Sequence, residues 1–140
     1  MRIFLDANIL FSAARTKSGA VAELIDWLLA EAHELVASDY VLLEARRNLE
    51  LQHEARALAA FDAFARRIVV VAQPAPRSGM SALERLPEKD RPVLAAAISS
   101  RSAVLLTGDR RHFGPFFGKR LAGVLVHSPA SLAAELLEDR

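Results

Sequence analysis

Short runs of apolar residues alternate along this chain with longer segments that have the periodicity of an amphipathic helix, and this alternation most constrains the fold. The apolar runs are predicted strands at residues 2–5, 35–37, 68–71, 104–107 and 123–126. The segments between them are predicted helices at residues 19–33, 40–51, 54–67 and 88–100, with another starting at Ser128-Pro129. Strands that are apolar throughout are typical of a sheet covered by helices on both faces. We therefore expect an α/β sandwich with a mostly parallel central sheet of about five strands.

The length of 140 residues predicts a single domain over residues 1–140. The Pro-rich segment 73–79 is interpreted as an internal loop of that domain and not as a linker. The first residues are too polar and too short for a signal peptide, and no window approaches the roughly 20 apolar residues of a membrane span. We expect a cytoplasmic protein without a membrane partner.

Two aspartates follow predicted strands where each strand ends. Asp6 comes directly after the strand at residues 2–5, and Asp109 follows the strand at 104–107 after a single glycine, Gly108, which allows a sharp turn. In an open α/β sheet, ligands bind outside the carboxyl ends of the strands, so the two carboxylates would meet there if the strands are neighbours. Either aspartate alone is as compatible with a turn or a helix cap. Their matched positions favour a functional site.

Two further acids have positions that allow them to join this pair. Asp90 lies at the start of a predicted helix, where an aspartate often only caps the helix. Glu44 lies in the helix at 40–51, at the margin of the apolar stripe and away from the charged face. The alternative for Glu44 is an ion pair with Arg46 or Arg47 on a solvated face.

Converging carboxylates would repel one another strongly unless a cation compensates them. The chain has no cysteine, which excludes disulfides, thiolate zinc sites and cysteine nucleophiles. Oxygen ligands without sulfur favour Mg²⁺ or Mn²⁺, and such ions support phosphoryl chemistry. The acids therefore predict a divalent-metal site suited to phosphate chemistry.

Four segments in order resemble the motifs of the PIN domain family. They are FLDANILFSA with Asp6, LLEARRNL with Glu44, EKDRPVLAAAI with Asp90 and LLTGDRRHF with Asp109. The resemblance implies a Rossmann-like α/β/α fold and a Mg²⁺- or Mn²⁺-dependent nuclease, most often an endoribonuclease that leaves a 5′-phosphate. Many small prokaryotic members that look like this chain are VapC-type toxins, which are dimeric and paired with an antitoxin. The implied partners are RNA, an antitoxin and a second copy of the chain.

The resemblance also implies roles for particular residues. Asp6, Asp90 and Asp109 would be the principal metal ligands, directly or through water, and Glu44 would complete the acidic site or orient the attacking water. Asn8 and Thr107 are candidates for hydrogen bonds that hold the carboxylates in place. Asn8 can equally be a turn residue, and Thr107 an ordinary strand residue.

The net charge of +1 does not by itself indicate a binding partner, so a charged ligand has to be inferred from where the cationic side chains lie. Arg110 and Arg111 follow Asp109 directly, and we expect them at the rim of the site, where they could bind RNA phosphates. No two histidines have the spacing of a metal-binding motif, so no histidine is assigned to the site. His112 could reach a phosphate or a leaving group, but the preferred interpretation is a surface residue that packs beside Phe113.

Two other functions remain compatible with the sequence. A non-catalytic RNA- or protein-binding module would retain the fold without cleaving anything. A metal-dependent phosphohydrolase of small phosphate esters would share the acidic site, because such a site does not specify polymer length.

Overall fold

The central sheet is mostly parallel and positions the carboxyl ends of its strands at one edge. A computed structural model describes residues 1–76 and 80–139 of the chain. Within them the sheet has the strand order β3-β2-β1-β4-β6-β5, and β5 is antiparallel to β6 whereas the other neighbours are parallel. The strands are β1 (Arg2–Leu5), β2 (Glu34–Ser38), β3 (Val69–Val71), β4 (Val104–Leu106), β5 (Arg120–Leu121) and β6 (Val124–His127).

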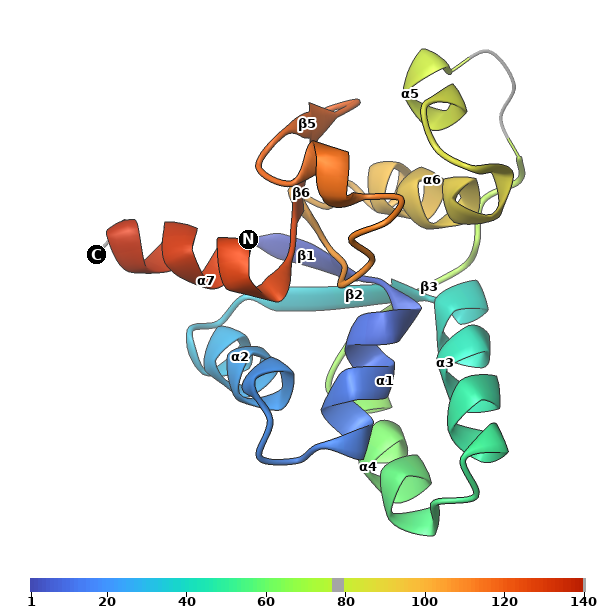
Figure 1. The fold of residues 1–140 in the computed structure, drawn as a ribbon, viewed down its shortest axis with the longest axis vertical. Coiled ribbons are helices and arrows are strands. Elements are labelled where there is room, and N and C mark those ends of the chain that lie inside the picture. Colours follow the sequence, from blue (N-terminus) through green and yellow to red (C-terminus); the bar gives the residue numbers. More distant parts are fainter. Residues whose placement is uncertain (77–79, 140) are drawn as a thin grey trace.

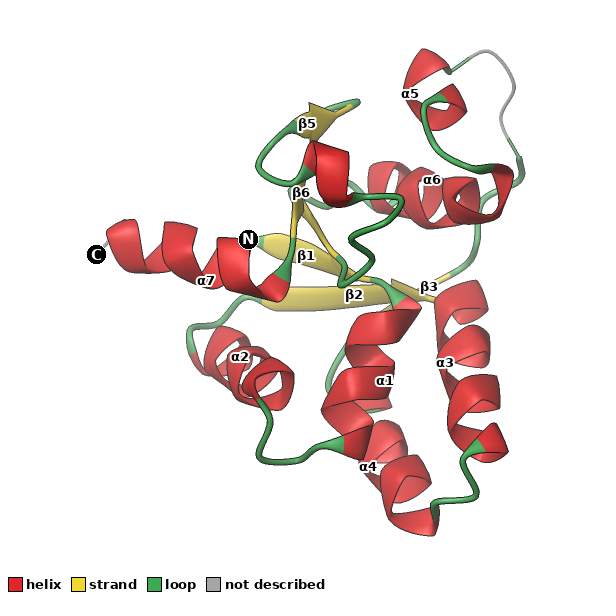
Figure 2. Ribbon diagram, in the orientation of Figure 1, coloured by secondary structure: helices red, strands yellow, loops and turns green. Residues whose placement is uncertain are grey.

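Helices cover both faces of this sheet, as the apolar strands predicted. Figure 1 shows α1 to α4 gathered on one face and α5 and α6 on the other, and Figure 2 shows the loops that join them to the strands. The α-helices are α1 (Ala7–Arg15), α2 (Ala20–Ala30), α3 (Asp39–Leu51), α4 (Ala55–Ala65), α5 (Ser81–Glu84), α6 (Arg91–Ser99) and α7 (Pro129–Glu138). Two short 3₁₀ helices are η1 (Glu88–Asp90) and η2 (Gly114–Phe116). The predicted α/β/α class is confirmed.

The middle strands anchor the edge at which the candidate acids lie. Ile3, Phe4 and Leu5 of β1 are fully buried, as are Leu105 and Leu106 of β4. Burying an aliphatic or aromatic side chain of this size contributes about 1.5–3 kcal/mol. The strands therefore hold the residues that directly follow them in fixed positions.

Four elements of the described fold were not predicted from the sequence, namely α1, β5 and the short helices α5 and η2. The helix α1 starts immediately after Asp6 and buries Ile9, Leu10 and Ala13 against the sheet. The sixth strand, β5, is a two-residue edge strand, which is too short to give a periodic signal. The prediction of about five strands therefore missed this edge strand.

Two further predictions concern loops and membranes. Residues 73–76 form no helix or strand, as predicted for the Pro-rich segment, and residues 77–79 of that segment lie outside the described residues. Among the described residues, none of the helices has the length and apolar character needed to cross a bilayer.

Candidate metal centre

Asp6 and Asp109 come from neighbouring strands. The strand β1 pairs in parallel with β4, and the backbone N–H of Asp6 donates to the carbonyl of Leu106 at 3.0 Å. Asp6 follows β1 directly, and Asp109 follows β4 after Thr107 and Gly108. Because both strands run in the same direction, the two aspartates lie at the same edge of the sheet.

The carboxylate of Asp6 is buried and held by three donors. Its side chain is the N-cap of α1, where Oδ1 accepts from the backbone N–H of Ala7 at 2.7 Å. Its Oδ2 accepts from the Thr107 hydroxyl at 2.8 Å and from the Asn8 amide at 3.2 Å. The residue is 6% exposed. These contacts fix its orientation toward the acidic cavity.

Asn8 and Gly108 link the two strand ends directly. The Asn8 Oδ1 accepts from the backbone N–H of Gly108 at 2.7 Å, and the backbone N–H of Asp109 donates to Thr107 Oγ1 at 3.2 Å. A β-carbon at Gly108 would lie 3.3 Å from Asn8 Oδ1, which is a tight contact. The φ of Gly108 is not positive, so this glycine provides room for Asn8 and not the left-handed turn that glycine often permits.

Asp90 adds a third carboxylate to the cavity that Asp6 and Asp109 line, and it comes from a different segment of the chain. It ends η1, and its Oδ2 lies 2.9 Å from His112 Nδ1. The same nitrogen lies 3.1 Å from Asp109 Oδ2, to which it is hydrogen-bonded. A single ring N–H can point well at one of these oxygens, and Asp90 Oδ2 is left buried without a hydrogen-bond donor among the described residues.

The carboxylate of Asp109 is held by backbone N–H groups of the turn that follows it. Its Oδ1 accepts from the backbone N–H groups of Arg111 at 3.0 Å and of His112 at 3.1 Å. One oxygen is thus occupied by the backbone, and Oδ2 faces His112 and Asp90. The two bonds to Asp109 Oδ1 resemble those of a helix cap, and they leave Asp109 Oδ2 directed toward His112 and Asp90.

The four predicted acids line one cavity of about 250 Å³ at the sheet edge. Glu44 reaches it from α3, and Asn48 lies one turn further along the same helix. Glu44 is exposed, and it makes no ion pair with Arg46 or Arg47, since Arg46 instead contacts Glu50 and Asp62. The polar residues lining the cavity are Asp6, Asn8, Tyr40, Glu44, Asn48, Lys89, Asp90 and Asp109.

The electrostatics of this cavity favour a cation. Burial raises the pKa of Asp6 to about 6, with Glu44 and Asp90 adding repulsion, against the hydrogen bonds from Thr107 and Ala7 that lower it. Burial likewise raises the pKa of Asp90, and Asp109 adds to it, whereas His112 and Lys89 act in the opposite direction. Two carboxylates are therefore costly to ionise in the protein alone.

The donor set fits a divalent cation. Ligand atoms of Asp90, Asp109 and His112 all lie within 4.8 Å of one another. Asp90 Oδ2 is a buried acceptor that lies 2.9 Å from His112 Nδ1 but has no hydrogen-bond donor among the described residues, and such an ion would satisfy it. Asp6, with its raised pKa, lines the same cavity. Oxygen-rich sites of this kind suit Mg²⁺ or Mn²⁺, and an imidazole suits the transition metal better.

His112 is the residue that the sequence interpretation placed wrongly. Its side chain is 19% exposed and lies between two acids, although it was expected to pack at the surface beside Phe113. The available signal was its position three residues after Asp109, which a turn brings back onto that carboxylate. Its contact with Asp90 joins distant segments and has no local signal.

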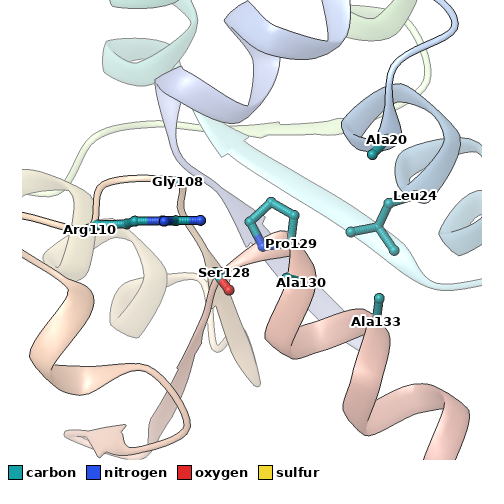
Figure 3. A pocket seen from close by; sticks show the side chains of 8 residues that line it. All are labelled: Ala20, Leu24, Gly108, Arg110, Ser128, Pro129, Ala130 and Ala133. Atoms are coloured by element: carbon teal, nitrogen blue, oxygen red, sulfur yellow. The ribbon is translucent and has the colours of Figure 1, made fainter.

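The two predicted rim arginines are exposed, and neither lines the acidic cavity. Arg110 lines a different cavity of about 380 Å³ beyond Gly108. Figure 3 shows its side chain beside Gly108, together with the residues Ser128, Pro129, Ala130 and Ala133 at the start of α7, and Ala20 and Leu24 of α2. Any contact of Arg110 with a bound polymer would therefore lie beyond the acidic cavity on the α7 side.

The fold and the site together define an α/β/α protein with an acidic cavity at the carboxyl edge of a mostly parallel sheet. The sequence matches the PIN domain family over residues 2–111, and the chain belongs to that family. Among curated proteins, no sequence matched this chain.

Solved structures share this fold at low sequence identity. The structure of VapBC2 from Rickettsia felis, bound to a DNA fragment from its promoter, matches with a TM-score of 0.69 and 17% identity, covering 91% of this chain and 98% of that one. PAE2754 from Pyrobaculum aerophilum matches with a TM-score of 0.65 and 21% identity, covering 99% and 90%. The sarcin-ricin loop cleaving toxin VapC20 from Mycobacterium tuberculosis matches with a TM-score of 0.54 and 16% identity, covering 78% and 91%.

Proposed function

We propose that this protein is a divalent-metal-dependent endoribonuclease that uses Mg²⁺ or Mn²⁺. The observation that carries this proposal is the convergence of Asp6, Glu44, Asp90 and Asp109 on one cavity, in which the buried Asp90 Oδ2 has no hydrogen-bond donor among the described residues. Membership of the PIN domain family supports a nuclease, and the resemblance to VapC20, a toxin that cleaves the sarcin-ricin loop, supports RNA as the substrate.

In this proposal Asp6, Asp90 and Asp109 hold the cation, and His112 is a fourth candidate ligand. A divalent ion bound there supplies Lewis-acid stabilisation to the charge that develops on the phosphate and lowers the pKa of water. Thr107 and Asn8 keep Asp6 Oδ2 in place, so the carboxylate does not need to reorganise when substrate binds.

Glu44 has a different environment from the other acids. It is exposed at the cavity, and the structure gives it no ion pair within residues 1–76 and 80–139. A carboxylate in this position can accept a proton from the attacking water, or orient that water by a hydrogen bond. We assign this role to Glu44 within the proposal.

We further propose that the protein is the toxin of a toxin–antitoxin pair. The similarity to VapBC2 from Rickettsia felis and to VapC20, which is a toxin, supports this proposal. Expression of the chain alone in a bacterial host should then inhibit growth, and the Asp109→Asn form should not. Normal growth at a verified level of soluble wild-type protein would argue against the toxin proposal without touching the nuclease proposal.

The nuclease proposal is tested by incubating purified protein with total RNA and a synthetic oligonucleotide, in Mg²⁺, Mn²⁺ or chelator. Cleavage products should carry a 5′-phosphate, should disappear with chelator, and should fall by at least about 100-fold in Asp6→Asn or Asp109→Asn. Asp26→Asn, a surface aspartate of α2, is the matched control. Salt-sensitive RNA binding that is indifferent to chelator and gives no cleavage would favour a non-catalytic module. Turnover of a small phosphate ester without RNA cleavage would favour a phosphohydrolase.

A further inference from the structure

One face of α1 runs from the acidic cavity to a region rich in cations. Asn8, Phe11, Ser12 and Arg15 are spaced by three and four residues, so they lie on the same side of the helix, and none of them is buried. Asn8 and Phe11 line the acidic cavity. Arg15 lies about 10 Å further along the helix axis than Asn8. Figure 1 shows α1 leaving the sheet at the end of β1, with its far end beside α4.

Two further cavities continue along this face. The first, of about 280 Å³, is lined by Phe11, Ser12 and Arg15 together with the turn before α2 and the start of that helix. The second, of about 670 Å³, lies between the end of α1 and α4 and is also lined by Arg15. Phe11 is thus shared by the acidic cavity and the first of these cavities, and Arg15 by the first and the second. The three cavities form a path along α1.

The cavity at the end of this path, which we call the basic cavity, carries an excess of positive charge. Arg15, Lys17 and Arg56 line it against one acid, Glu54, and its other lining residues are alanines of α1 and α4. Lys17 and Arg56 are exposed, and neither forms an ion pair within the part of the chain that the structure describes. The cations therefore outnumber the acid, and such a cavity attracts a polyanion.

Arg15 lies where the path enters the basic cavity, and two contacts hold its side chain. Its guanidinium lies over the Phe11 ring, 5.4 Å from the ring centroid, and its Nη2 lies 3.5 Å from Glu54 Oε1. A guanidinium has five N–H donors, so the single contact with Glu54 leaves most of them for another acceptor. Its planar fork matches two oxygens of one phosphate. Arg15 can therefore bind a phosphate with donors that Glu54 does not use.

We propose that the basic cavity binds backbone phosphates of the RNA strand whose scissile phosphate lies in the acidic cavity, and that the nucleotides between them follow the exposed face of α1. This inference rests on the proposed function, since it makes RNA the ligand, and it adds a second contact region for the same strand. The distance from Asn8 to Arg15 corresponds to about three nucleotides at the spacing of one strand in a duplex. A dinucleotide with a single phosphate cannot occupy both cavities.

The test measures the binding of fluorescein-labelled hexauridylate by fluorescence anisotropy at several salt concentrations, in chelator to prevent cleavage. The double variant Lys17→Ala/Arg56→Ala should bind at least about tenfold more weakly at low salt. The slope of log affinity against log salt should fall by about 1.4, because two phosphate contacts are lost. The control Arg66→Ala/Lys119→Ala removes the same charge from exposed residues that line none of the three cavities, and it should behave as the wild type.

Cleavage in Mn²⁺ supplies a measurement that involves both cavities. The wild type should have a kcat/KM about tenfold higher for hexauridylate than for the dinucleotide uridylyl-uridine, because only the longer strand reaches the basic cavity. The double variant Lys17→Ala/Arg56→Ala should lose most of this increase, and the control double variant should keep it. Thermal melts show whether each protein is folded.

Equal affinity and salt slope in the wild type and in Lys17→Ala/Arg56→Ala would overturn the proposal. So would an equal loss in the control double variant, since that loss would reflect net charge alone. Hexaglutamate that binds as tightly as hexauridylate, and is lost in the same variant, would assign the basic cavity to an acidic protein segment and would also overturn the proposal.

The binding measurement separates this proposal from that of the nuclease. RNA cleavage by the wild type, with binding unchanged in Lys17→Ala/Arg56→Ala, would remove the basic cavity from the RNA path and leave the nuclease. Binding that is lost in this variant, without cleavage by the wild type in any metal, would support the basic cavity as an RNA site and count against the nuclease.

Discussion

The Thr107 hydroxyl donates a 2.8 Å hydrogen bond to Asp6 Oδ2 across two neighbouring strands of the sheet. The two residues are 101 positions apart in the chain, and both are buried. This bond, with those of Asn8, joins the first and fourth acidic motifs into one unit. The geometry of the acidic cavity thus depends on sheet register as much as on the acids themselves.

Replacing Thr107 by Val should weaken this unit while preserving the shape of the strand. The loss of a hydrogen bond to a charged acceptor costs about 1.5–3 kcal/mol of unfolding free energy, and it frees Asp6 to rotate. Chemical denaturation should show the destabilisation, and calorimetry should show weaker Mn²⁺ binding. Thr107→Ser, which keeps the hydroxyl, should retain most of both, and equal loss in the two variants would point to packing instead.

Asp6 also predicts how stability depends on pH in the metal-free protein. Its pKa is raised from 3.8 to about 6 in the folded state, so the folded state binds this proton more tightly than the unfolded state. Protonation of Asp6 therefore stabilises the folded state. This contribution to the unfolding free energy is complete below about pH 4 and is lost as the pH rises through about 6. A shift of this size corresponds to about 3 kcal/mol.

Asp6→Asn should therefore remove this pH dependence. At pH 7.5 without metal, the relief of not ionising a buried carboxylate should offset the loss of the Oδ2 acceptor that Thr107 and Asn8 use, so the variant should be about as stable as the wild type, although it should not cleave RNA. Unfolding free energies measured between pH 4 and 7.5 check the slope. The unfolding free energy of the wild type should fall relative to that of the variant as the pH rises from 4 to 7.5. The same pH dependence in both proteins would contradict the assignment to Asp6.

Gly108→Ala tests the close approach of Asn8. The added β-carbon would lie 3.3 Å from Asn8 Oδ1, so the amide must move by a few tenths of an ångström and its 2.7 Å bond to the Gly108 N–H must lengthen. We expect a loss of about 1 kcal/mol in stability and weaker metal binding. Gly114→Ala, where the nearest atom is 3.9 Å away, is the control with no such crowding.

Arg111 tests the proposed contact with RNA phosphates. If it binds one phosphate of the polymer, Arg111→Ala should weaken binding and reduce the slope of log affinity against log salt by about 0.7 for a single strand. Arg66→Ala, which removes an exposed arginine just before β3 at the opposite edge of the sheet, should leave the slope unchanged. Equal slopes for all three proteins would remove Arg111 from the RNA contact.

The strand–helix alternation and the strand-end rule predicted most of the fold and the neighbourhood of Asp6 and Asp109. The pairing of β1 with β4 places these two residues at one edge of the sheet. The strands could be predicted because apolar periodicity is a local pattern that can be read directly from the sequence. The helix α1 was missed because it starts only one residue after β1 ends, with Asp6 as the only residue between them. A helix cap and a place in the acidic site were alternatives for Asp6 in the sequence, and in the structure Asp6 both caps α1 and lines the acidic cavity.

Other features depend on contacts between distant segments and have no local pattern. His112 meets Asp90 because η1 and the turn after β4 converge in space. The exposure of Glu44 at the cavity, at the margin of the apolar stripe of α3, depends on how that helix packs against α1. Likewise Arg110 directly follows Asp109 in sequence and yet lines a different cavity, together with residues of α2 and α7.

The central claim, that the acidic cavity holds a divalent cation, is tested most directly by titrating Mn²⁺ into the metal-free protein by calorimetry. We predict a saturable site in the wild type and in the control Asp26→Asn, with affinity reduced by at least about tenfold in Asp109→Asn, whose amide oxygen can still accept from the backbone of Arg111 and His112. His112→Gln should weaken Mn²⁺ more than Mg²⁺ if the imidazole is a ligand. Unchanged Mn²⁺ affinity in a folded Asp109→Asn protein would contradict the account.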